Sequence, residues 1–247
     1  MRCIEIEGAR ELHVTCGDDG AEVLIKGRAF DEALAERLVS EAGFNTVGFD
    51  DGSHRGPGFV KLDMDGLAYS VSPWSFFQSN WTMNREIVRM VSEGLGPVEG
   101  RRVLDLYAGA GNFSMPLAAA GAKVVAVEEN PNSIRDGMRN ITANGLARFQ
   151  FVEGSAERAK LKGGAFDILI LDPPRAGLTN AAVVRVADIA PERIVYISCN
   201  PSTFARDLKK LSEGYEIDSI RMADFFPQTY HIESVAFLTK KGTTPPA

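Results

Sequence analysis

From Val103 onward, short apolar runs alternate with segments of helical periodicity, and each run leads into a polar residue or a glycine turn. Strands that alternate with helices form βαβ units, and such units build a mostly parallel sheet with helices on both faces. In an open sheet of this kind, ligands bind beyond the carboxyl ends of the strands. The pattern therefore predicts a doubly wound α/β fold with its functional groups at one sheet edge. The main runs are 103–106, 124–127, 168–171 and 194–197.

Cys199 follows the last of these runs, in the segment Ser198-Cys199-Asn200-Pro201. Asn200 and Pro201 suit the cap and the first residue of a helix, so the thiol is expected beside the positive end of a helix dipole. Such a position favours the thiolate and makes Cys199 a candidate nucleophile. The alternative is that Cys199 is an inert, small apolar residue beside a strand.

A glycine turn follows the run 103–106 and leads into a predicted helix from Met115 to Ala120. Glycines allow a ligand to approach the backbone, and a helix start favours an anionic group. The next run ends in Glu128, whose carboxylate suits the two hydroxyls of a ribose. The combination indicates a nucleoside-bearing cofactor. Ser114 stands where a dinucleotide-binding site has a third Gly or an Ala, so S-adenosylmethionine fits better than NAD. Asp105 or the helix start is available to the methionine part of that cofactor.

Two further carboxylates lie at predicted strand ends. Asp172 follows the run 168–171, and two prolines and Arg175 come directly after it. The prolines force a rigid, non-helical exit, and the arginine could reach a phosphate, although a simple strand-to-loop boundary has the same residues. Glu233 lies in a predicted strand, where a buried carboxylate needs a partner or a task, unless it is only a strand-edge charge. The nearby His231 is expected to be structural.

Five segments occur in this order along the chain: Phe77-Gln78-Ser79-Asn80, Asp105 to Phe113, Asp172-Pro173-Pro174-Arg175, Ser198-Cys199-Asn200-Pro201 and Pro227 to Glu233. Together they resemble the RNA uracil-5-methyltransferases, over roughly residues 70 to 240. The resemblance implies a Rossmann-like class I methyltransferase fold, S-adenosylmethionine as cofactor and a uridine in ribosomal or transfer RNA as substrate.

The resemblance also implies a role for each matching residue. Cys199 corresponds to the nucleophile that adds to uracil C6, and Glu233 to the base that removes the proton from C5. The positions implied to bind the cofactor are Gln78, Tyr107, Asn112, Glu128 and Asp172, and Gly109 belongs to the glycine turn beside them. Covalent addition makes C5 nucleophilic, which explains why a cysteine is required.

The region before residue 74 predicts a small, separate α/β unit. Residues 2–26 alternate in short runs, a helix is expected from Asp31, and residues 44–73 are rich in turn formers and predict hairpins. We therefore expect domains at 1–73 and 74–241, followed by a loose tail at 242–247. The aromatic residues Trp74, Phe76, Phe77 and Trp81 suit core packing or domain docking better than stacking on RNA bases.

The charge of the chain has the wrong sign for an autonomous RNA-binding protein. It carries 27 basic and 33 acidic residues, a formal net charge of -6. Many members of the resembled family carry an N-terminal oligonucleotide-binding barrel, and some carry cysteines for an iron–sulfur cluster, but this sequence matches neither pattern. We expect either that the docking module is missing or that local basic residues such as Arg175 and Arg206 contact RNA phosphates.

The cysteine pattern and hydropathy bear on the environment of the protein. Its three cysteines form neither a disulfide framework nor a metal-binding cluster, and no stretch reaches the length of a membrane span. We expect a cytoplasmic protein without metal or membrane partner. Two other functions remain open: methylation of cytosine C5 or of an exocyclic amine, and an RNA module that binds the cofactor without catalysis. Amine methylation would not need Cys199.

Overall fold

The computed structural model describes residues 4–78, 80–229 and 232–243. They form two compact units, one of Met1–Ser79 with Asn132–Gly145 and one of Asn80–Pro131 with Leu146–Ala247. The first unit thus extends beyond the expected boundary at residue 73 and also takes in most of helix α4 (Pro131–Ala143). Within the described ranges, no helix combines the length and apolar character needed to cross a membrane. Residues 244–247 of the expected tail lie outside those ranges.

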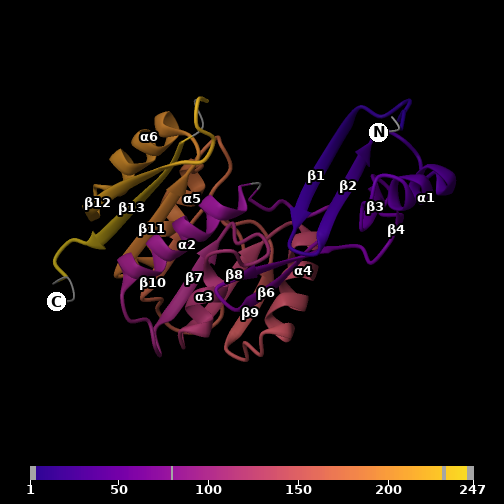
Figure 1. Cartoon of the computed structure of the whole chain (residues 1–247). Helices are drawn as coiled ribbons and strands as arrows, with labels where there is room; N and C mark the ends of the chain where they lie inside the picture. The colour runs from indigo at the N-terminus through magenta and orange to yellow at the C-terminus, as the bar shows by residue number, and fades with distance from the viewer. Residues whose placement is uncertain (1–3, 79, 230–231, 244–247) are drawn as a thin grey trace. The chain divides into compact units, whose positions relative to one another are not determined.

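A small α/β sheet makes up the beginning of the first unit (Figure 1). Its strand order is β1-β2-β3-β4, with β2 and β3 parallel and joined through α1. Asp31 caps α1, because its side chain accepts a hydrogen bond from the backbone N–H of Leu34 at 3.0 Å. This confirms the helix predicted from Asp31. The bounds are β1 Glu11–Gly17, β2 Gly20–Lys26, α1 Glu32–Ser40, β3 Thr46–Phe49 and β4 His54–Arg55.

The predicted hairpin is formed by β5 (Val60–Met64) and β6 (Leu67–Val71). Two side chains of α4 and that of Asn144, the residue after it, are spaced four residues apart and accept hydrogen bonds from alternate backbone N–H groups at the edge of β6. Four helical residues rise about 6 Å and two strand residues about 6.6 Å, so the two spacings match. Helix α4 therefore covers an otherwise unpaired strand edge. The bonds run from Ala68 to Asn144 (2.9 Å), from Ser70 to Asn140 (2.7 Å) and from Ser72 to Asp136 (2.8 Å).

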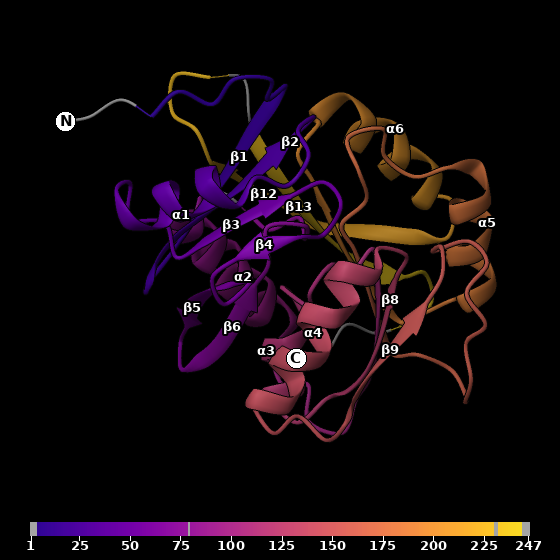
Figure 2. The same ribbon diagram turned by 90° about the vertical axis from the view of Figure 1, so that its right-hand side faces the viewer.

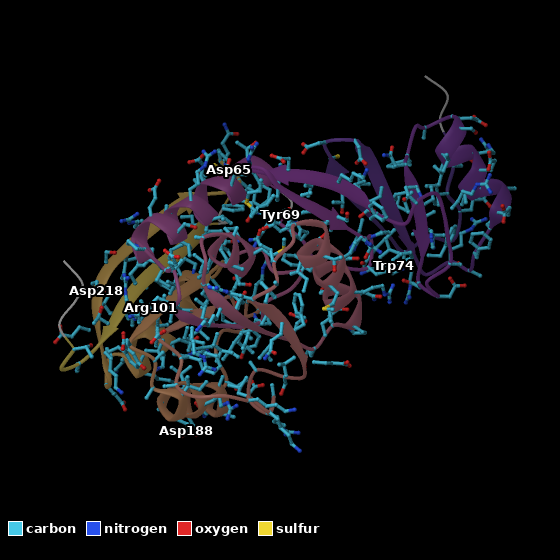
Figure 3. The ribbon with its side chains drawn as sticks, turned by 90° about the horizontal axis from the view of Figure 1, so that it is seen from below. Asp65, Tyr69, Trp74, Arg101, Asp188 and Asp218 are labelled. Atoms are coloured by element: carbon cyan, nitrogen blue, oxygen red, sulfur yellow. The ribbon has the colours of Figure 1, made fainter. Side chains whose placement is uncertain are left out.

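Trp74 belongs to the core of the first unit (Figure 3). Its indole N–H donates to the carbonyl oxygen of Phe49 at 2.8 Å, and its ring makes an edge contact with His54. Core packing, as predicted, is therefore its role. Phe76, two residues further on, is 75% exposed and does not share this packing.

The second unit contains the predicted doubly wound sheet (Figure 2). Its order is β12-β13-β11-β10-β7-β8-β9, in which β13 runs antiparallel to both neighbours and the other pairings are parallel. The mostly parallel architecture is confirmed, and Glu233 lies, as expected, in a strand of a β-hairpin, which β12 and β13 form; β9 was not predicted. The strands are β7 Arg102–Leu106, β8 Lys123–Glu128, β9 Phe149–Glu153, β10 Ile168–Leu171, β11 Arg193–Ser198, β12 Tyr215–Asp224 and β13 Ile232–Lys240; the helices are α2 Trp81–Leu95, α3 Ser114–Ala119, α5 Asn180–Ile189 and α6 Pro201–Leu211.

The centre of this sheet is mostly apolar, with Asp105 of β7 as a buried polar exception. Leu104 and Leu106 of β7, Leu169 and Leu171 of β10 and Tyr196 of β11 have at most 1% of their surface exposed. Strands buried on both faces have continuous apolar runs, because helices cover each side. The rigid centre fixes the positions of the residues that follow each strand.

Candidate active site

Four strands of the second unit deliver predicted site residues to one edge of the sheet. Tyr107 follows β7, Glu128 ends β8, Asp172 follows β10 and Cys199 follows β11. These strands are parallel, so their carboxyl ends meet at the same edge. The prediction that polar groups gather there is confirmed for these four residues.

Glu233 reaches the same edge from the opposite direction. Because β13 is antiparallel to β11, its first residues lie beside the last residues of β11. Ser198, the last residue of β11, pairs with Ser234 of β13. One position closer to the sheet edge, Cys199 follows Ser198 and Glu233 precedes Ser234. The structure therefore brings Cys199 and Glu233 together across the ladder, and the charge of Glu233 acts on the thiol.

The surroundings of Cys199 oppose its ionisation. Burial raises the pKa of the thiol above its usual value, the charge of Glu233 raises it further, and a hydrogen bond from Arg175 lowers it. The predicted helix start is present, since the Asn200 side chain accepts from the N–H of Ser202 at 3.0 Å. The expectation of a readily formed thiolate was nevertheless wrong for the protein alone, because desolvation and negative charge outweigh that position.

Three carboxyl groups at this edge have raised pKa values. Burial raises the pKa of Glu233 to about 7, partly offset by Arg175. Burial also raises the pKa of Asp105 to about 7; the nearby Ser114 side chain partly offsets this rise, and the charge of Glu128 adds to it. The pKa of Asp172 lies well above its usual range through desolvation and the charges of Glu233 and Asp105. Such a group of poorly solvated acids is complementary to a cation.

Asp105 is the most isolated of these acids. Its side chain is only 1% exposed, and neither carboxyl oxygen has a hydrogen-bond partner within the described part of the chain. A buried carboxyl without a partner is costly unless a ligand completes its surroundings. Asp105 is therefore a candidate ligand-binding residue.

The glycine turn after β7 is held in an unusual conformation. Tyr107 and Gly109 have positive φ angles of 67° and 55°, which tightly reverses the chain at the strand end. The N–H of Gly109 donates to Glu128 at 2.8 Å. Asn112 forms two reciprocal hydrogen bonds with Asn84 of α2, of 2.8 and 2.9 Å. The turn is thus fixed by Glu128 and Asn84, and the cofactor contacts implied for Tyr107, Gly109 and Asn112 stay predictions.

Two arginines predicted to contact RNA differ in their surroundings. Arg175 is exposed, and it lowers the pKa of both Cys199 and Glu233. It therefore lies at the candidate reaction centre. Arg206 donates to Asp207 and to the carbonyl oxygen of Ala176, both at 2.8 Å. These hydrogen bonds attach its guanidinium to the protein, and its contact with RNA stays a prediction.

Three other predictions concern Gln78, His231 and metal binding. Gln78 belongs to the other compact unit, where it is partly buried in the segment after β6, so its cofactor contact stays a prediction. His231 lies outside the described residues. Within the described ranges, no group of at least three histidine, cysteine, aspartate or glutamate side chains is arranged to hold a metal ion.

Sequence reasoning missed Asn84 and Asp207, which hold the glycine turn and the loop after Asp172. Both are fully buried. Neither lies at the end of an apolar run, and each contacts a segment distant in the sequence. The sequence signal for both is a polar residue on the apolar face of an amphipathic helix: Asn84 lies on the buried face of α2 and Asp207 on that of α6.

The strand order, the single antiparallel strand and the glycine turn facing an acidic strand end define a Rossmann-like class I methyltransferase fold. The family model described as tRNA (Uracil-5-)-methyltransferase matches residues 60–241, and the chain belongs to this family.

Curated relatives and solved structures agree with this membership. The chain is 39% identical over 188 residues to a 23S rRNA (uracil(747)-C(5))-methyltransferase of Pyrococcus abyssi, covering 76% of this chain and 44% of the relative. It is 39% identical over 181 residues to a 23S rRNA (uracil(1939)-C(5))-methyltransferase of a Shewanella strain, covering 71% and 40%. The chain thus spans less than half the length of these relatives.

A solved structure extends the similarity to most of this chain. It is a Pyrococcus abyssi tRNA (uracil-54, C5)-methyltransferase in complex with S-adenosyl-L-homocysteine, with a TM-score of 0.75 and 33% identity. The similarity covers 92% of this chain and 59% of that one.

Proposed function

We propose that this chain transfers a methyl group from S-adenosylmethionine to C5 of a uridine in ribosomal or transfer RNA. The observation that carries the proposal is the placement of Cys199 and Glu233 across the β11–β13 ladder, with Arg175 beside both. A nucleophile, a base and a cation in one place are what covalent catalysis at uracil requires. The relatives named above act on uracil C5 in 23S rRNA or in tRNA, which supports this substrate class.

The residues at the sheet edge fit S-adenosylmethionine. The cofactor carries an ammonium group, a sulfonium centre and a ribose, and it supplies the electrophilic methyl group. Among the described residues, neither buried oxygen of Asp105 has a hydrogen-bond partner, which suits the ammonium group. Glu128 holds the glycine turn through one oxygen, and a carboxylate retains further acceptor sites for ribose hydroxyls. Family resemblance adds Gln78, Tyr107, Gly109, Asn112 and Asp172 to this set.

In the proposed mechanism, the Cys199 thiolate adds to C6 of uracil and forms a carbon–sulfur bond. The electron pair of the C5–C6 double bond moves toward C5 and O4, and C5 becomes nucleophilic enough to take the methyl group, whose bond to the sulfonium sulfur breaks and leaves a neutral thioether. Arg175 stabilises the thiolate, since its hydrogen bond and charge lower the pKa of Cys199. A uridine within structured RNA must leave its stack to reach the thiol.

Glu233 completes the reaction. After methyl transfer, C5 carries a proton that must leave before the thiolate can be eliminated. Glu233 is proposed to remove this proton, so that the C5–H electron pair restores the double bond and the carbon–sulfur bond breaks. A base works best when its pKa lies near the working pH, and burial raises the pKa of Glu233 to about 7.

The test is to incubate the protein with methyl-labelled S-adenosylmethionine and unmodified ribosomal or transfer RNA, then digest the RNA and identify the labelled nucleoside. We expect label in 5-methyluridine, and none with Cys199→Ala, which should still bind the cofactor. Label in a cytidine or in an amino group would favour another RNA base. Cofactor binding without any transfer would favour an RNA module that is inactive by itself.

A further inference from the structure

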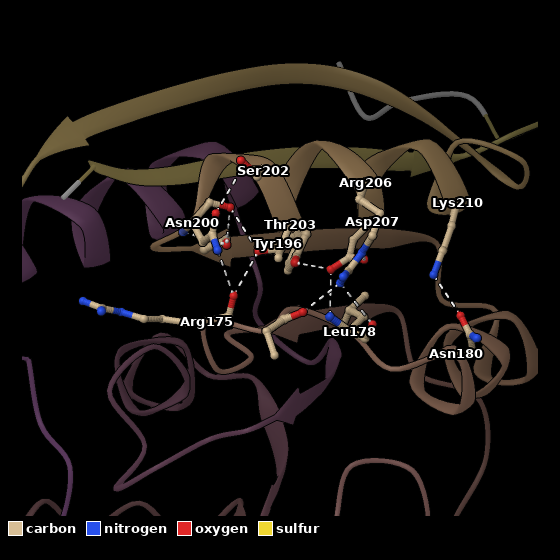
Figure 4. A network of polar contacts seen from close by, with 12 residues as sticks. Arg175, Leu178, Asn180, Tyr196, Asn200, Ser202, Thr203, Arg206, Asp207 and Lys210 are labelled. Carbon is tan, nitrogen blue, oxygen red and sulfur yellow. Dashed lines mark hydrogen bonds and ion pairs between the residues drawn. The ribbon is translucent and has the colours of Figure 1, made fainter. Parts of the chain in front are cut away.

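One face of α6 is attached to the loop that follows Asp172 (Figure 4). The side chains concerned recur every three or four residues and therefore share one helix face. Most of their partners are backbone groups of the loop, so the contacts fix its main chain. Asn200, which caps α6, and Thr203 donate hydrogen bonds to the backbone oxygen of Arg175 (3.1 and 3.2 Å), and Arg206 donates to that of Ala176 (2.8 Å). Asp207 accepts from the backbone N–H of Leu178 (2.7 Å), and Lys210 donates to the side chain of Asn180 (2.9 Å).

Asp207 is the centre of this attachment. Its side chain is fully buried, and the oxygen that accepts from Leu178 also accepts from the Tyr196 hydroxyl at 2.8 Å. Its other oxygen accepts from Arg206 at 2.8 Å. One carboxylate thus joins strand β11, the loop and helix α6, and charged hydrogen bonds of this kind are the stronger ones.

Gly177 shows how closely the loop approaches this helix face. Its φ is 72°, and a side chain there would collide with the Asp207 carboxylate and would reach within 2.6 Å of the Arg206 guanidinium. Only glycine combines this backbone angle with such an approach at low cost. The loop therefore has little freedom to move relative to α6.

We infer that Arg206 and Asp207 are positioning residues for the nucleophile, because they fix the loop in which the backbone oxygen of Arg175 accepts a hydrogen bond from Asn200, the residue next to Cys199. The inference rests on the proposed function insofar as Cys199 is taken as the reactive group. Arg206 then acts through the loop within the protein, whereas the sequence suggested that it contacts RNA.

The charged groups that face Cys199 come from two elements besides its own. Arg175 and Asp172 belong to the segment after β10, and Glu233 belongs to β13. Arg175 lowers the thiol pKa, whereas the two carboxylates raise it. If the loop loosens, the thiol keeps Glu233 but loses part of its contact with Arg175. The reactivity of the thiol is therefore the property that the loop contacts should change.

The experiment measures the rate at which iodoacetamide alkylates Cys199 between pH 6 and 10, by mass spectrometry of the peptide that contains it. No RNA or cofactor is added. We expect Arg206→Met to raise the apparent pKa of the thiol by about 0.5, which slows alkylation at pH 7.5 about threefold. Arg175→Met should act in the same direction. Lys209→Met removes one positive charge from an exposed position of the same helix and should react like the parent protein.

Two further variants separate position from charge and from misfolding. Arg206→Lys keeps the charge but cannot reproduce the planar set of donors, so it should also slow alkylation. Gly177→Ala disturbs the same contact from the loop side and should do the same, with circular dichroism to verify that each variant is folded. The inference would be overturned if Cys199 in folded Arg206→Lys were alkylated as fast as in the parent protein. It would also be overturned if folded Arg206→Met were alkylated at the parent rate but bound RNA more weakly.

The alkylation experiment and the methyl-transfer assay can fail independently of each other. Alkylation reports on the thiol itself, whether or not the protein methylates RNA. If Cys199→Ala retained methyl transfer, the proposed function would fail, while the effect of Arg206 on the thiol could still be measured. Conversely, unchanged alkylation in folded variants would overturn the positioning role and leave the methyl-transfer assay unaffected.

Discussion

Glu233 lies across the antiparallel ladder from Cys199, one residue beyond the paired Ser198 and Ser234. The negative charge of Glu233 raises the pKa of the thiol, and the Glu233 carboxyl itself titrates at about 7. Ionisation of one group therefore opposes ionisation of the other, and their protons leave as a coupled pair. The nucleophile and the base cannot be analysed independently.

The first prediction concerns this coupling. Glu233→Gln removes a negative charge beside the thiol, so it should lower the apparent pKa of Cys199 and speed alkylation at pH 7.5 about threefold. The pH dependence of alkylation measures the effect. Glu216→Gln, at an exposed position of the neighbouring strand β12, is the control and should leave the rate unchanged. An unchanged or slower rate in Glu233→Gln would contradict the coupling.

The same variant should separate two stages of catalysis. Without a base to take the C5 proton, the methylated adduct cannot release the cysteine, so Glu233→Gln should accumulate RNA bound covalently to Cys199. Denaturing electrophoresis detects such a complex. Efficient release of 5-methyluridine by this variant would assign proton removal to another group.

The second prediction concerns Glu22 of β2. Its side chain is fully buried, neither oxygen has a hydrogen-bond partner within the described ranges, and burial raises its pKa from 4.5 to about 9. Between these values the folded protein keeps a proton that the unfolded chain releases, so stability falls as pH rises through this window, by up to ~1.4 kcal/mol per pH unit.

Glu22→Gln has no such proton to lose. Its free energy of unfolding relative to the parent should therefore increase from pH 5.5 to pH 8, as measured by urea denaturation at both values. Glu5→Gln, at an exposed position, should show no comparable trend. A constant difference between Glu22→Gln and the parent would mean that Glu22 is ionised in the folded state.

The third prediction concerns the edge of β6. Asp136 is 1% exposed and accepts hydrogen bonds from the backbone and hydroxyl of Ser72 and from the hydroxyl of Ser75, at 2.5 to 2.8 Å. Asp136→Ala leaves these donors without a partner, which should destabilise the protein by about 2–4 kcal/mol. Urea denaturation measures the loss. Asp188→Ala, at an exposed position of α5, should cost less than about 0.5 kcal/mol.

The sequence was most informative where the apolar pattern alone determines position. Parallel strands place their ends at one edge, so Glu128, Asp172 and Cys199 were predictable from the runs that precede them. Glu233 required the order and direction of β13, which the pattern alone does not contain. Its role came from family resemblance, and the ladder then placed it beside Cys199.

The features of the candidate site that the sequence did not predict depend on contacts between segments that are distant along the chain. Asp207 accepts from Leu178, 29 positions earlier in the chain, and no local periodicity predicts such a bond. The ionisation of Cys199 was mispredicted for a related reason. A helix start is visible in the sequence, whereas desolvation and the charges of Glu233 and Asp172 depend on the folded surroundings.

The fourth prediction tests whether Asp105 holds the cofactor. Its carboxyl is buried and has no hydrogen-bond partner among the residues that the structure describes, and burial raises its pKa to about 7. The ionised form binds a cation better, so the affinity for S-adenosylmethionine should increase from pH 6 to pH 8 as Asp105 loses its proton. Asp105→Asn should bind the cofactor at least about tenfold more weakly and lose most of this pH dependence, because one unit of pKa shift corresponds to a tenfold difference in binding. Calorimetric titration at both pH values measures this, with Asp188→Asn as the control; equal affinity of Asp105→Asn and the parent at pH 8 would exclude Asp105 from the cofactor site.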